Sequence, residues 1–492
     1  MISSPVFAGK RYAVLGLARS GLATVAALLA SGAHVTAWDN DEAKRQGILP
    51  GTGRGTAGVA GGGGGLASGD AFVEAPLHQP AAGPPPRAGE DLTIADPMVV
   101  DLAGFDGIVV SPGVPLNTHP IAARAAAAGV PVIGDIELFA QARASLPAHK
   151  VVGITGTNGK STTTALIHHI LVTAGVPTTM GGNIGLPILG QEPLAEGGVY
   201  VLELSSFQID LTHSLDCDVA VLTNITPDHL DRYEGFEAYA TSKHRLFEMQ
   251  KRSHVAVTTD SAGSADYYNK VIRGSADRGS AWANTEFLDI IGSSVADGEA
   301  WQDGDAFAFQ KDWPALQGPH NAQNAACAIA VSNELGLPLP VIAEGLRTYP
   351  GLAHRMERVA EVGGVLYVND SKATNATSAA PALAAYPKVH WILGGRRKTD
   401  DLDACAPHYG HVVAAYTIGE SAELFKELLL RSGIYTIDTL TLEAAVRQAS
   451  AVARPGETVL LSPACASYDQ FTDYEARGDA FKAAVAMLGS RT

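Results

Sequence analysis

A glycine-rich turn between an apolar run and a helix-like segment carries the residues whose types and spacing most clearly indicate chemistry. The apolar run is residues 151–154, and Lys160, Ser161 and Thr162 follow the turn. The turn itself comprises Gly156, Thr157, Asn158 and Gly159. In such loops the backbone amides face an anion, a lysine reaches the outer phosphates, and a hydroxyl coordinates Mg²⁺. Lys160 would supply the charge, and Ser161 or Thr162 the metal-binding oxygen.

The spacing of this turn departs from the standard phosphate-binding loop. The position five residues before Gly159 is Ile154, where that loop has glycine. An ordinary glycine-rich turn between a strand and a helix is therefore the alternative. Because Lys160 is followed by four hydroxyl residues, 161–164, which packing does not explain, the phosphate-binding interpretation is favoured.

Two further strand ends in the middle of the chain carry ionisable side chains. Glu203 follows the apolar run 199–202, where an ATPase places a second metal ligand, although a strand-end carboxylate exposed to water is the alternative. His229 follows the apolar run 219–224 and is flanked by aspartates. It could be a metal ligand or a base, or part of a helix-capping cluster.

Tyr239 and Lys243 are four residues apart, so on a helix they share one face. A lysine near a Mg²⁺ site would repel the ion unless it paired with phosphate or lost its positive charge.

The N-terminal region has the pattern of a nucleotide-binding βαβ unit. We expect a strand at 12–15, a turn, a helix at 22–30 and a second strand at 34–38 that ends at Asp39, where a ribose hydroxyl could be held. An NAD-binding oxidoreductase is the alternative function of this unit. It leaves the phosphate loop, Glu203 and His229 unexplained. Ala18 also occupies the middle glycine position of the dinucleotide fingerprint.

A change of composition interrupts this unit near 47–89, where glycine and proline runs predict a flexible surface insertion. Apolar runs at 99–101 and 107–110 then predict the return of the sheet. The second run is broken at its carboxyl end by Ser111-Pro112-Gly113, where open α/β sheets bind ligands, although a plain turn is equally consistent.

Length and charge limit the class of protein. The 492 residues are enough for about three domains, and a net charge of -16 argues against general affinity for nucleic acid or anionic membrane. The four scattered cysteines indicate neither a zinc site nor a disulfide framework, which fits a reducing cytoplasm. No signal core and no stretch of about twenty apolar residues is present, so neither secretion nor membrane insertion is expected.

Four motifs resemble, in order and separation, those of the Mur ligases, the ATP-dependent amide-forming enzymes of peptidoglycan precursor synthesis. They are residues 156–162, 203–208, 224–231 and 318–324. Folylpolyglutamate synthetases share only part of this set. The resemblance implies an α/β protein of three domains: a Rossmann-like domain at 1–148 for a UDP-substrate, a P-loop ATPase-like domain at 149–351, and a Rossmann-like domain at 352–492 for the incoming amino acid.

The resemblance also implies the roles of individual residues. Catalysis would depend on Lys160, Glu203, His229 and Lys243, with Lys243 carbamylated by CO₂. Two Mg²⁺ ions would be held by Ser161, Glu203, His229 and the Lys243 carbamate. ATP would be bound by Gly156, Thr157, Asn158, Gly159, Lys160, Ser161, Thr162, Asn321, Asn324, Arg355, Asp370 and Lys372.

The segments 369–375 and 462–471 resemble the family member that adds D-glutamate to UDP-N-acetylmuramoyl-L-alanine through an acyl phosphate. A sibling that adds another amino acid is the alternative, but the Asp-Asn-Pro-Arg motif of the diaminopimelate-adding member is absent. The UDP-substrate contacts would be Gly16, Leu17, Ala18, Arg19, Asp39, Asn40, Ser111 and Asn183. The D-glutamate contacts would be Thr374, Lys398, Ser467, Tyr468 and Tyr474.

Three departures from this member's pattern affect the predicted contacts. Tyr468 replaces the usual leucine, Gly394-Gly395-Arg396 replaces a Gly-Gly-Asp form, and the insertion follows the expected uridine-binding strand. A cytoplasmic monomer is expected.

Overall fold

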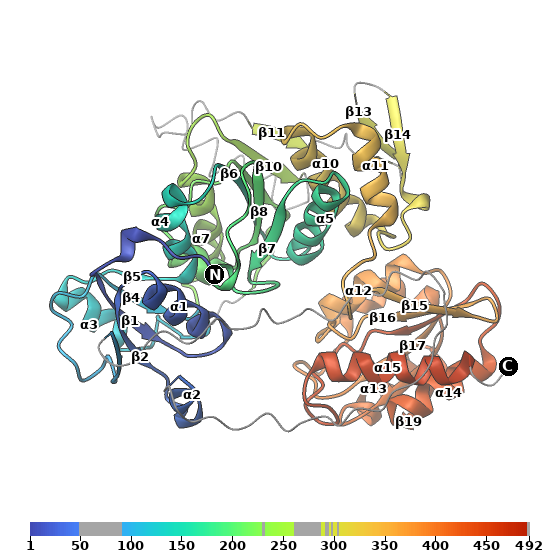
Figure 1. Ribbon diagram of the computed structural model, residues 1–492. Helices are drawn as coiled ribbons and strands as arrows, with labels where there is room; N and C mark the ends of the chain where they lie inside the picture. Colours follow the sequence, from blue (N-terminus) through green and yellow to red (C-terminus); the bar gives the residue numbers. More distant parts are fainter. Residues whose placement is uncertain are drawn as a thin grey trace, which may run out of the picture.

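The computed structural model describes residues 1–48, 91–228, 232–259, 287–290, 295–296, 299–302 and 305–489. Within these ranges the chain forms three large, mainly parallel sheets with helices packed on them, in the order of the sequence (Figure 1). The predicted α/β class is therefore confirmed. The insertion expected near 47–89 lies outside the described residues beyond Ile48, and so does His229.

The first sheet has the order β3-β2-β1-β4-β5 and is parallel throughout. Its strands are β1 Arg11–Leu15, β2 His34–Trp38, β3 Leu92–Ile94, β4 Gly107–Val110 and β5 Val132–Ile133. Its helices are α1 Arg19–Ala30, α2 Glu42–Gln46, α3 Ile121–Ala128 and α4 Asp135–Ala142. The predicted strand, turn, helix and strand at the N-terminus are confirmed.

The prediction of a strand at 99–101 is wrong, because this segment is a turn. The carboxylate of Asp96 accepts the amide of Met98 at 2.9 Å, its carbonyl accepts the amide of Val99 at 3.0 Å, and Val99 is 77% exposed. The aspartate caps the local amides, so two valines cannot extend into a ladder. The strand that returns the chain to the sheet is β3, which precedes this turn.

The second sheet is also parallel and has the order β11-β10-β9-β6-β8-β7. Its strands are β6 His149–Thr155, β7 Thr178–Gly182, β8 Gly198–Glu203, β9 Val219–Leu222, β10 Val255–Thr259 and β11 Phe287–Ile290. Its helices are α5 Lys160–Thr173, α6 Ser206–Asp210, α7 Phe236–Glu248, α10 Pro319–Glu334 and α11 Leu339–Thr348. Because β6 lies between β8 and β9, the turn after β6 adjoins the carboxyl ends of both neighbours.

One feature of this region differs from the sequence expectations. A small antiparallel sheet that was not predicted follows β11, formed by β12 Val295–Ala296, β13 Glu299–Gln302 and β14 Asp305–Phe309.

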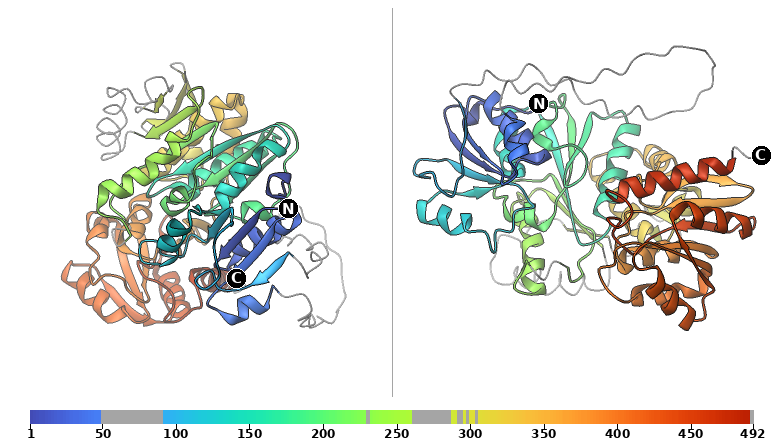
Figure 2. Two further views of the ribbon diagram at one scale, coloured as in Figure 1. Left: turned by 90° about the vertical axis from the view of Figure 1, so that its left-hand side faces the viewer. Right: turned by 90° about the horizontal axis from the view of Figure 1, so that it is seen from below.

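The third sheet has the order β15-β16-β20-β17-β18-β19, with only β15 antiparallel to its neighbour. Its strands are β15 Glu357–Val362, β16 Val365–Asn369, β17 Val389–Gly394, β18 Val412–Ile418, β19 Thr436–Leu440 and β20 Thr458–Leu461. Its helices are α12 Ala376–Ala385, α13 Ala422–Arg431, α14 Leu442–Val452 and α15 Tyr474–Gly489. Figure 2 shows this unit, in orange and red, beside the other two.

The hydrophobic cores show how the three sheets are joined. One cluster of buried side chains runs from the first sheet into the second and includes Phe7, Val25, Val151 and Leu202. The two clusters of the third sheet contain no residue before Met356. The first two units are therefore packed as one body, whereas the third unit has cores of its own.

In the described part of the chain, no helix combines the length and hydropathy that a membrane span requires. All four cysteines are buried and have free thiols.

The centre of β6 allows a test of this packing. A Cβ atom at Gly153 would lie 2.6 Å from the Sγ atom of Cys217, closer than van der Waals contact allows. We expect Gly153→Ala to destabilise the protein by about 1–3 kcal/mol through overpacking. The thermal unfolding midpoint measured by calorimetry should fall. The Gly153→Ala/Cys217→Ala double variant should be more stable than the sum of the two single changes predicts, and strict additivity would contradict the steric explanation.

Candidate active site

The turn after β6 has the backbone of a phosphate-binding loop. Gly156 and Gly159 have φ angles of +144° and +84°, values that favour glycine. A Cβ atom at Gly156 would overlap Thr223 Oγ1, and one at Gly159 would overlap Asn324 Oδ1. Gly159 is the residue before α5 and no side chain caps that helix, so its first amides can bind an anion.

The segment that follows β9 holds this loop in place. Thr157 donates its amide to the carbonyl of Asn224 at 3.0 Å, and the Asn224 side chain pairs with the backbone of Asn158 at 2.9 Å in both directions. Thr226 donates its amide to Thr157 Oγ1 at 3.0 Å, and Tyr239 lies 3.1 Å from the same oxygen. The loop is therefore fixed before any ligand binds.

Two lysines converge on one backbone oxygen beneath the loop. Lys160 Nζ donates to the carbonyls of Gly156 and Thr157 at 3.0 and 2.8 Å. Lys243 Nζ donates to the same Gly156 carbonyl at 2.8 Å and lies 4.6 Å from the centre of the Tyr239 ring. The predicted helix face shared by Tyr239 and Lys243 is confirmed on α7.

The environment of these lysines disfavours their charged forms. Lys243 is 2% exposed, and burial, followed by repulsion from Lys160, lowers its pKa to about 7. Burial also lowers the pKa of Lys160, although the nearby carboxylate of Glu203 opposes that shift. The region is therefore suited to anionic groups.

Glu203 ends β8 and is 2% exposed, which excludes the solvent-exposed alternative. Its Oε1 accepts a hydrogen bond from Asn183 at 2.9 Å, and its buried Oε2 has no partner among the described residues. An unpartnered, buried carboxylate oxygen near Lys160 fits a hard cation such as Mg²⁺. Within the described ranges, which do not include His229, no group of three His, Cys, Asp or Glu side chains gathers as a metal site.

A cleft of about 390 Å³ opens in front of the phosphate loop. Its lining unites residues of the second sheet with residues of the third. The predicted ATP contacts other than Gly156 line it: Thr157 to Thr162 of the loop and helix, Asn321, Asn324, Arg355, Asp370 and Lys372. His320, Tyr349 and Pro381 also line it and give it an apolar part. A nucleoside triphosphate therefore fits both the charge and the composition of this cleft.

Arg355 reaches the cleft from a strained connection between the two units. The residues on either side of it, His354 and Met356, have φ angles of +61° and +46°, which are uncommon for non-glycine residues. Glu357 accepts the amide of His354 at 2.9 Å, and Asp370 accepts the amide of Met356 at 3.1 Å. These carboxylates fix the backbone conformation that presents Arg355.

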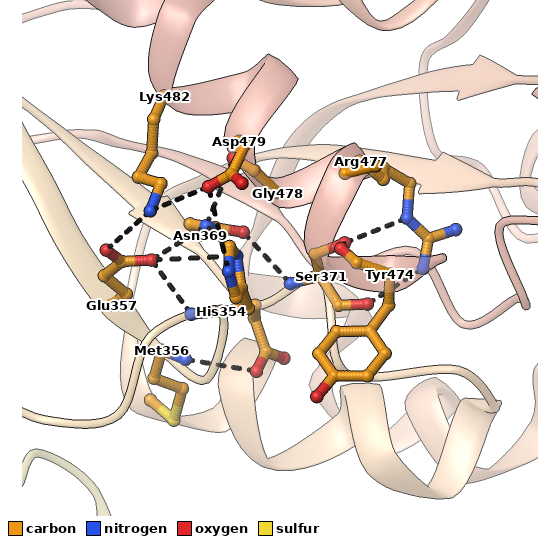
Figure 3. Close-up of polar contacts among 12 residues, drawn as sticks. His354, Met356, Glu357, Asn369, Ser371, Tyr474, Arg477, Gly478, Asp479 and Lys482 are labelled. Atoms are coloured by element: carbon orange, nitrogen blue, oxygen red, sulfur yellow. Dashed lines mark hydrogen bonds and ion pairs between the residues drawn. The ribbon is translucent and has the colours of Figure 1, made fainter. Parts of the chain in front are cut away.

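The cleft wall from the third sheet is built on a polar network (Figure 3). Asn369 donates to Glu357 at 2.9 Å, and its Oδ1 accepts the amide of Ser371 at 3.2 Å. Arg477 donates to the hydroxyl and carbonyl oxygens of Ser371 at 3.0 and 2.8 Å. Burial raises the pKa of Asp370 to about 7. The turn that carries Asp370 and Lys372 is therefore held from several sides.

Four of the residues predicted to bind D-glutamate, Thr374, Lys398, Ser467 and Tyr468, lie on loops at the carboxyl edge of the third sheet, and the fifth, Tyr474, begins α15. Lys398 Nζ is 3.5 Å from Thr374 Oγ1, so the structure brings this pair together. Ser467 is buried, whereas Tyr468 is 66% exposed. The Tyr474 ring is 5.5 Å from Lys372 Nζ.

The residues predicted to bind the UDP-substrate lie at the carboxyl edge of the first sheet, apart from Asn183, which contacts Glu203 in the second. Asp39 accepts the amides of Leu17 at 2.7 Å and Asp41 at 2.9 Å, so its carboxylate shapes the loop. These bonds lower the pKa of Asp39 despite the desolvation that raises it. Most of the other predicted residues make contacts within the protein. The carbonyl of Gly16 accepts a hydrogen bond from the Ser111 hydroxyl at 2.9 Å, and the guanidinium of Arg19 donates to the Gly185 carbonyl at 3.4 Å. The side chain of Asn40 accepts a hydrogen bond from the Trp38 indole at 3.3 Å, and Ala18 is the residue before α1.

Sequence reasoning missed several residues that shape the site. Thr223 donates to the Asn158 carbonyl at 2.6 Å, yet the strand order that places it there is not encoded locally. His320 lines the cleft, and burial lowers its pKa to about 4, so it is neutral at physiological pH. Its place in the motif at 318–324 could have drawn attention to it. Arg477 gave no local signal.

Comparison with known proteins agrees with this architecture. Residues 154–332 match the family model of the Mur ligase middle domain, and residues 354–465 match that of the Mur ligase glutamate ligase domain. The chain belongs to the Mur ligase family. The NAD-binding oxidoreductase alternative is therefore set aside.

Within that family, the chain is similar over its whole length to proteins named UDP-N-acetylmuramoylalanine--D-glutamate ligase. It is 55% identical to that of Novosphingobium aromaticivorans, covering 99% of this chain and 97% of the relative. It is 54% identical to that of Sphingopyxis alaskensis, with both chains fully covered.

Solved structures share the fold. UDP-N-acetylmuramate-alanine ligase MurC of Thermotoga maritima aligns with a TM-score of 0.53 and 16% identity, covering 98% of this chain and 100% of the other. MurF ligase of the same organism, in complex with ADP, aligns with a TM-score of 0.52 and 18% identity, covering 78% and 90%.

Removing the loop cation should weaken nucleotide binding. Lys160→Ala deletes a buried ammonium aimed at the phosphate-binding turn, and a charge-assisted hydrogen bond is worth about 1.5–3 kcal/mol, or about 10- to 100-fold in affinity. Calorimetric titration with ATP and Mg²⁺ should show this loss. Lys150→Ala, which removes an exposed lysine from β6, is the control and should bind normally. Unchanged affinity in Lys160→Ala would contradict the assignment of the loop.

Proposed function

We propose that this protein joins D-glutamate to UDP-N-acetylmuramoyl-L-alanine at the expense of ATP, in peptidoglycan precursor synthesis. The observation that carries the proposal is the cleft in which the phosphate loop and Lys160 face Arg355, Asp370 and Lys372 from another sheet. The identity of the amino acid is supported by the similarity to the D-glutamate ligases along the entire chain.

The proposed reaction has two steps. An oxygen of the L-alanyl carboxylate attacks the terminal phosphorus of ATP, and ADP leaves, which gives an acyl phosphate. The amine of D-glutamate then attacks the acyl carbon, inorganic phosphate leaves, the amine loses a proton, and an amide remains. Lys160 and the amides at the start of α5 stabilise the negative charge of the transferred phosphoryl group.

Two Mg²⁺ ions would be held by Ser161, Glu203, His229 and the modified Lys243. Bound there, the ions would neutralise phosphate charge and orient the two oxygens between which phosphorus moves. The orphaned Oε2 of Glu203 supports this ligand set.

The three units have distinct proposed tasks, with boundaries near residues 148 and 351. The first sheet would bind the UDP-substrate through Gly16, Leu17, Ala18, Arg19, Asp39, Asn40 and Ser111, with Asn183 from the second sheet. The third would bind D-glutamate through Thr374, Lys398, Ser467, Tyr468 and Tyr474. Contact across the cleft would exclude water, which otherwise hydrolyses an acyl phosphate. We also propose that the enzyme is a cytoplasmic monomer.

We propose in addition that Lys243 acts as a carbamate. Its amine is buried beside Lys160 and Tyr239, where a second ammonium is disfavoured. Its hydrogen-bond acceptor within the described part of the chain is the neutral carbonyl of Gly156. Reaction with CO₂ would replace that cation by an anion able to bind Mg²⁺.

The function is tested by phosphate release from ATP with UDP-N-acetylmuramoyl-L-alanine and one amino acid at a time. We expect turnover with D-glutamate at least about 100-fold above that with L-glutamate, meso-diaminopimelate or L-lysine, because the site would hydrogen-bond both carboxylates in one configuration. Detection of the dipeptidyl product by mass spectrometry completes the measurement. Preference for another of these amino acids would identify a sibling activity.

The carbamate is tested by Lys243→Ala. We expect this variant to lose most activity and to regain part of it in millimolar acetate, because a free carboxylate can occupy the position of the missing anion. In the unmodified protein, isotope-labelled CO₂ should give a carbamate signal in carbon NMR that Lys243→Ala lacks, which does not depend on turnover. Full activity of the folded alanine variant would rule the carbamate out.

A further inference from the structure

Arg477 joins two loops that are far apart in the sequence. It lies near the start of α15 and is 1% exposed. Its Nε donates to Ser371 Oγ at 3.0 Å, and its Nη2 donates to the carbonyls of Ser371 and Cys465 at 2.8 and 3.0 Å. Figure 3 shows the bonds of Arg477 to Ser371. Because a guanidinium holds its donors in one rigid plane, the bonds to Ser371 and Cys465 fix the two loops relative to each other.

A third loop packs against the same guanidinium through backbone alone. A Cβ atom at Gly395 would lie 3.2 Å from Arg477 Nη1 and would overlap the carbonyl of Ala466. Gly395 has a φ of +127° and directly follows β17. Any side chain at this position would push the loop away from Arg477.

The charge of Arg477 does not serve stability in an obvious way. The acceptors that bind it are two carbonyls and a hydroxyl, and its Nη1 has no partner among the described residues. A buried cation held by neutral acceptors costs desolvation energy that an apolar side chain would avoid. Burial lowers the pKa of Arg477 to about 10, so the group stays charged at neutral pH. Its rigid geometry is what an apolar side chain could not provide.

Each of the three loops carries a predicted contact of the amino-acid substrate. Thr374 lies three residues after Ser371, Lys398 three after Gly395, and Ser467 two after Cys465. We propose that Arg477 is a positioning residue that holds these loops in the relative arrangement that binds D-glutamate next to the nucleotide cleft. This inference rests on the proposed function.

The test compares Michaelis constants in variants of Arg477. Arg477→Met retains an aliphatic side chain of similar length without the guanidinium group. Arg477→Lys retains the positive charge without the planar arrangement of donors. We expect KM for D-glutamate to rise at least about tenfold in Arg477→Met and less in Arg477→Lys, with KM for the UDP-substrate within about twofold of normal in both. The UDP-substrate binds a different sheet, so a role confined to general folding would not produce this split.

The control is Lys482→Met on the same helix. It removes a cation whose ion pairs are to Glu357 at 3.4 Å and Asp479 at 3.0 Å, neither of which belongs to the three loops. This variant should keep a normal KM for D-glutamate.

Should Arg477→Met fail to fold by calorimetry, Ser371→Ala removes one acceptor and should give a smaller rise of the same kind. An unchanged KM for D-glutamate in the Arg477 variants, or an equal rise for every substrate, would overturn the proposal. Failure of the unmodified enzyme to use D-glutamate would instead overturn the proposed function, and that measurement precedes the variants.

Discussion

Two lysine ammonium groups share the carbonyl of Gly156, and the rest of the site depends on this concentration of positive charge. Lys160 and Lys243 donate to it at 3.0 and 2.8 Å in a buried setting. Burial and repulsion from Lys160 lower the pKa of Lys243. Two ammonium groups in the free site therefore cost electrostatic free energy, and a bound anion would offset that cost. The loop amides and the helix start favour the same occupant, an anion such as phosphate.

Non-local packing supplies the geometry that this charge requires. Because β6 lies between β8 and β9, the phosphate loop after β6 has Glu203 at the end of β8 on one side. The segment from Thr223 to Thr226, which follows β9, lies on the other side. The shared core of the first two sheets fixes the phosphate loop relative to the carboxyl edge of the first sheet, while the third sheet retains separate cores. Only the third sheet is therefore free to change its position without breaking a common core.

The sequence indicated the parts of this site whose signals are local. The phosphate loop, the carboxylate at the end of β8 and the four-residue spacing of Tyr239 and Lys243 are all encoded in short stretches. The hydrogen bonds of Thr223 and the three-loop contact of Arg477 depend on strand order and on where α15 packs, so no short pattern could predict them. The strand predicted at 99–101 did not form, because side-chain capping by Asp96 outweighed the strand propensity of the two valines.

The connection into the third sheet shows why the two halves of the cleft act together. Arg355 lies between two residues held at positive φ, and the groups that hold them, Glu357 and Asp370, belong to the third sheet. Such backbone costs about 1–3 kcal/mol per residue and persists only where the surroundings enforce it. The position of Arg355 in the cleft is thus set by the unit that would bind the amino acid. Asp370 adds to this link, because one of its oxygens holds the Met356 amide while the other accepts the Ser462 hydroxyl at the end of β20, which leads toward Ser467.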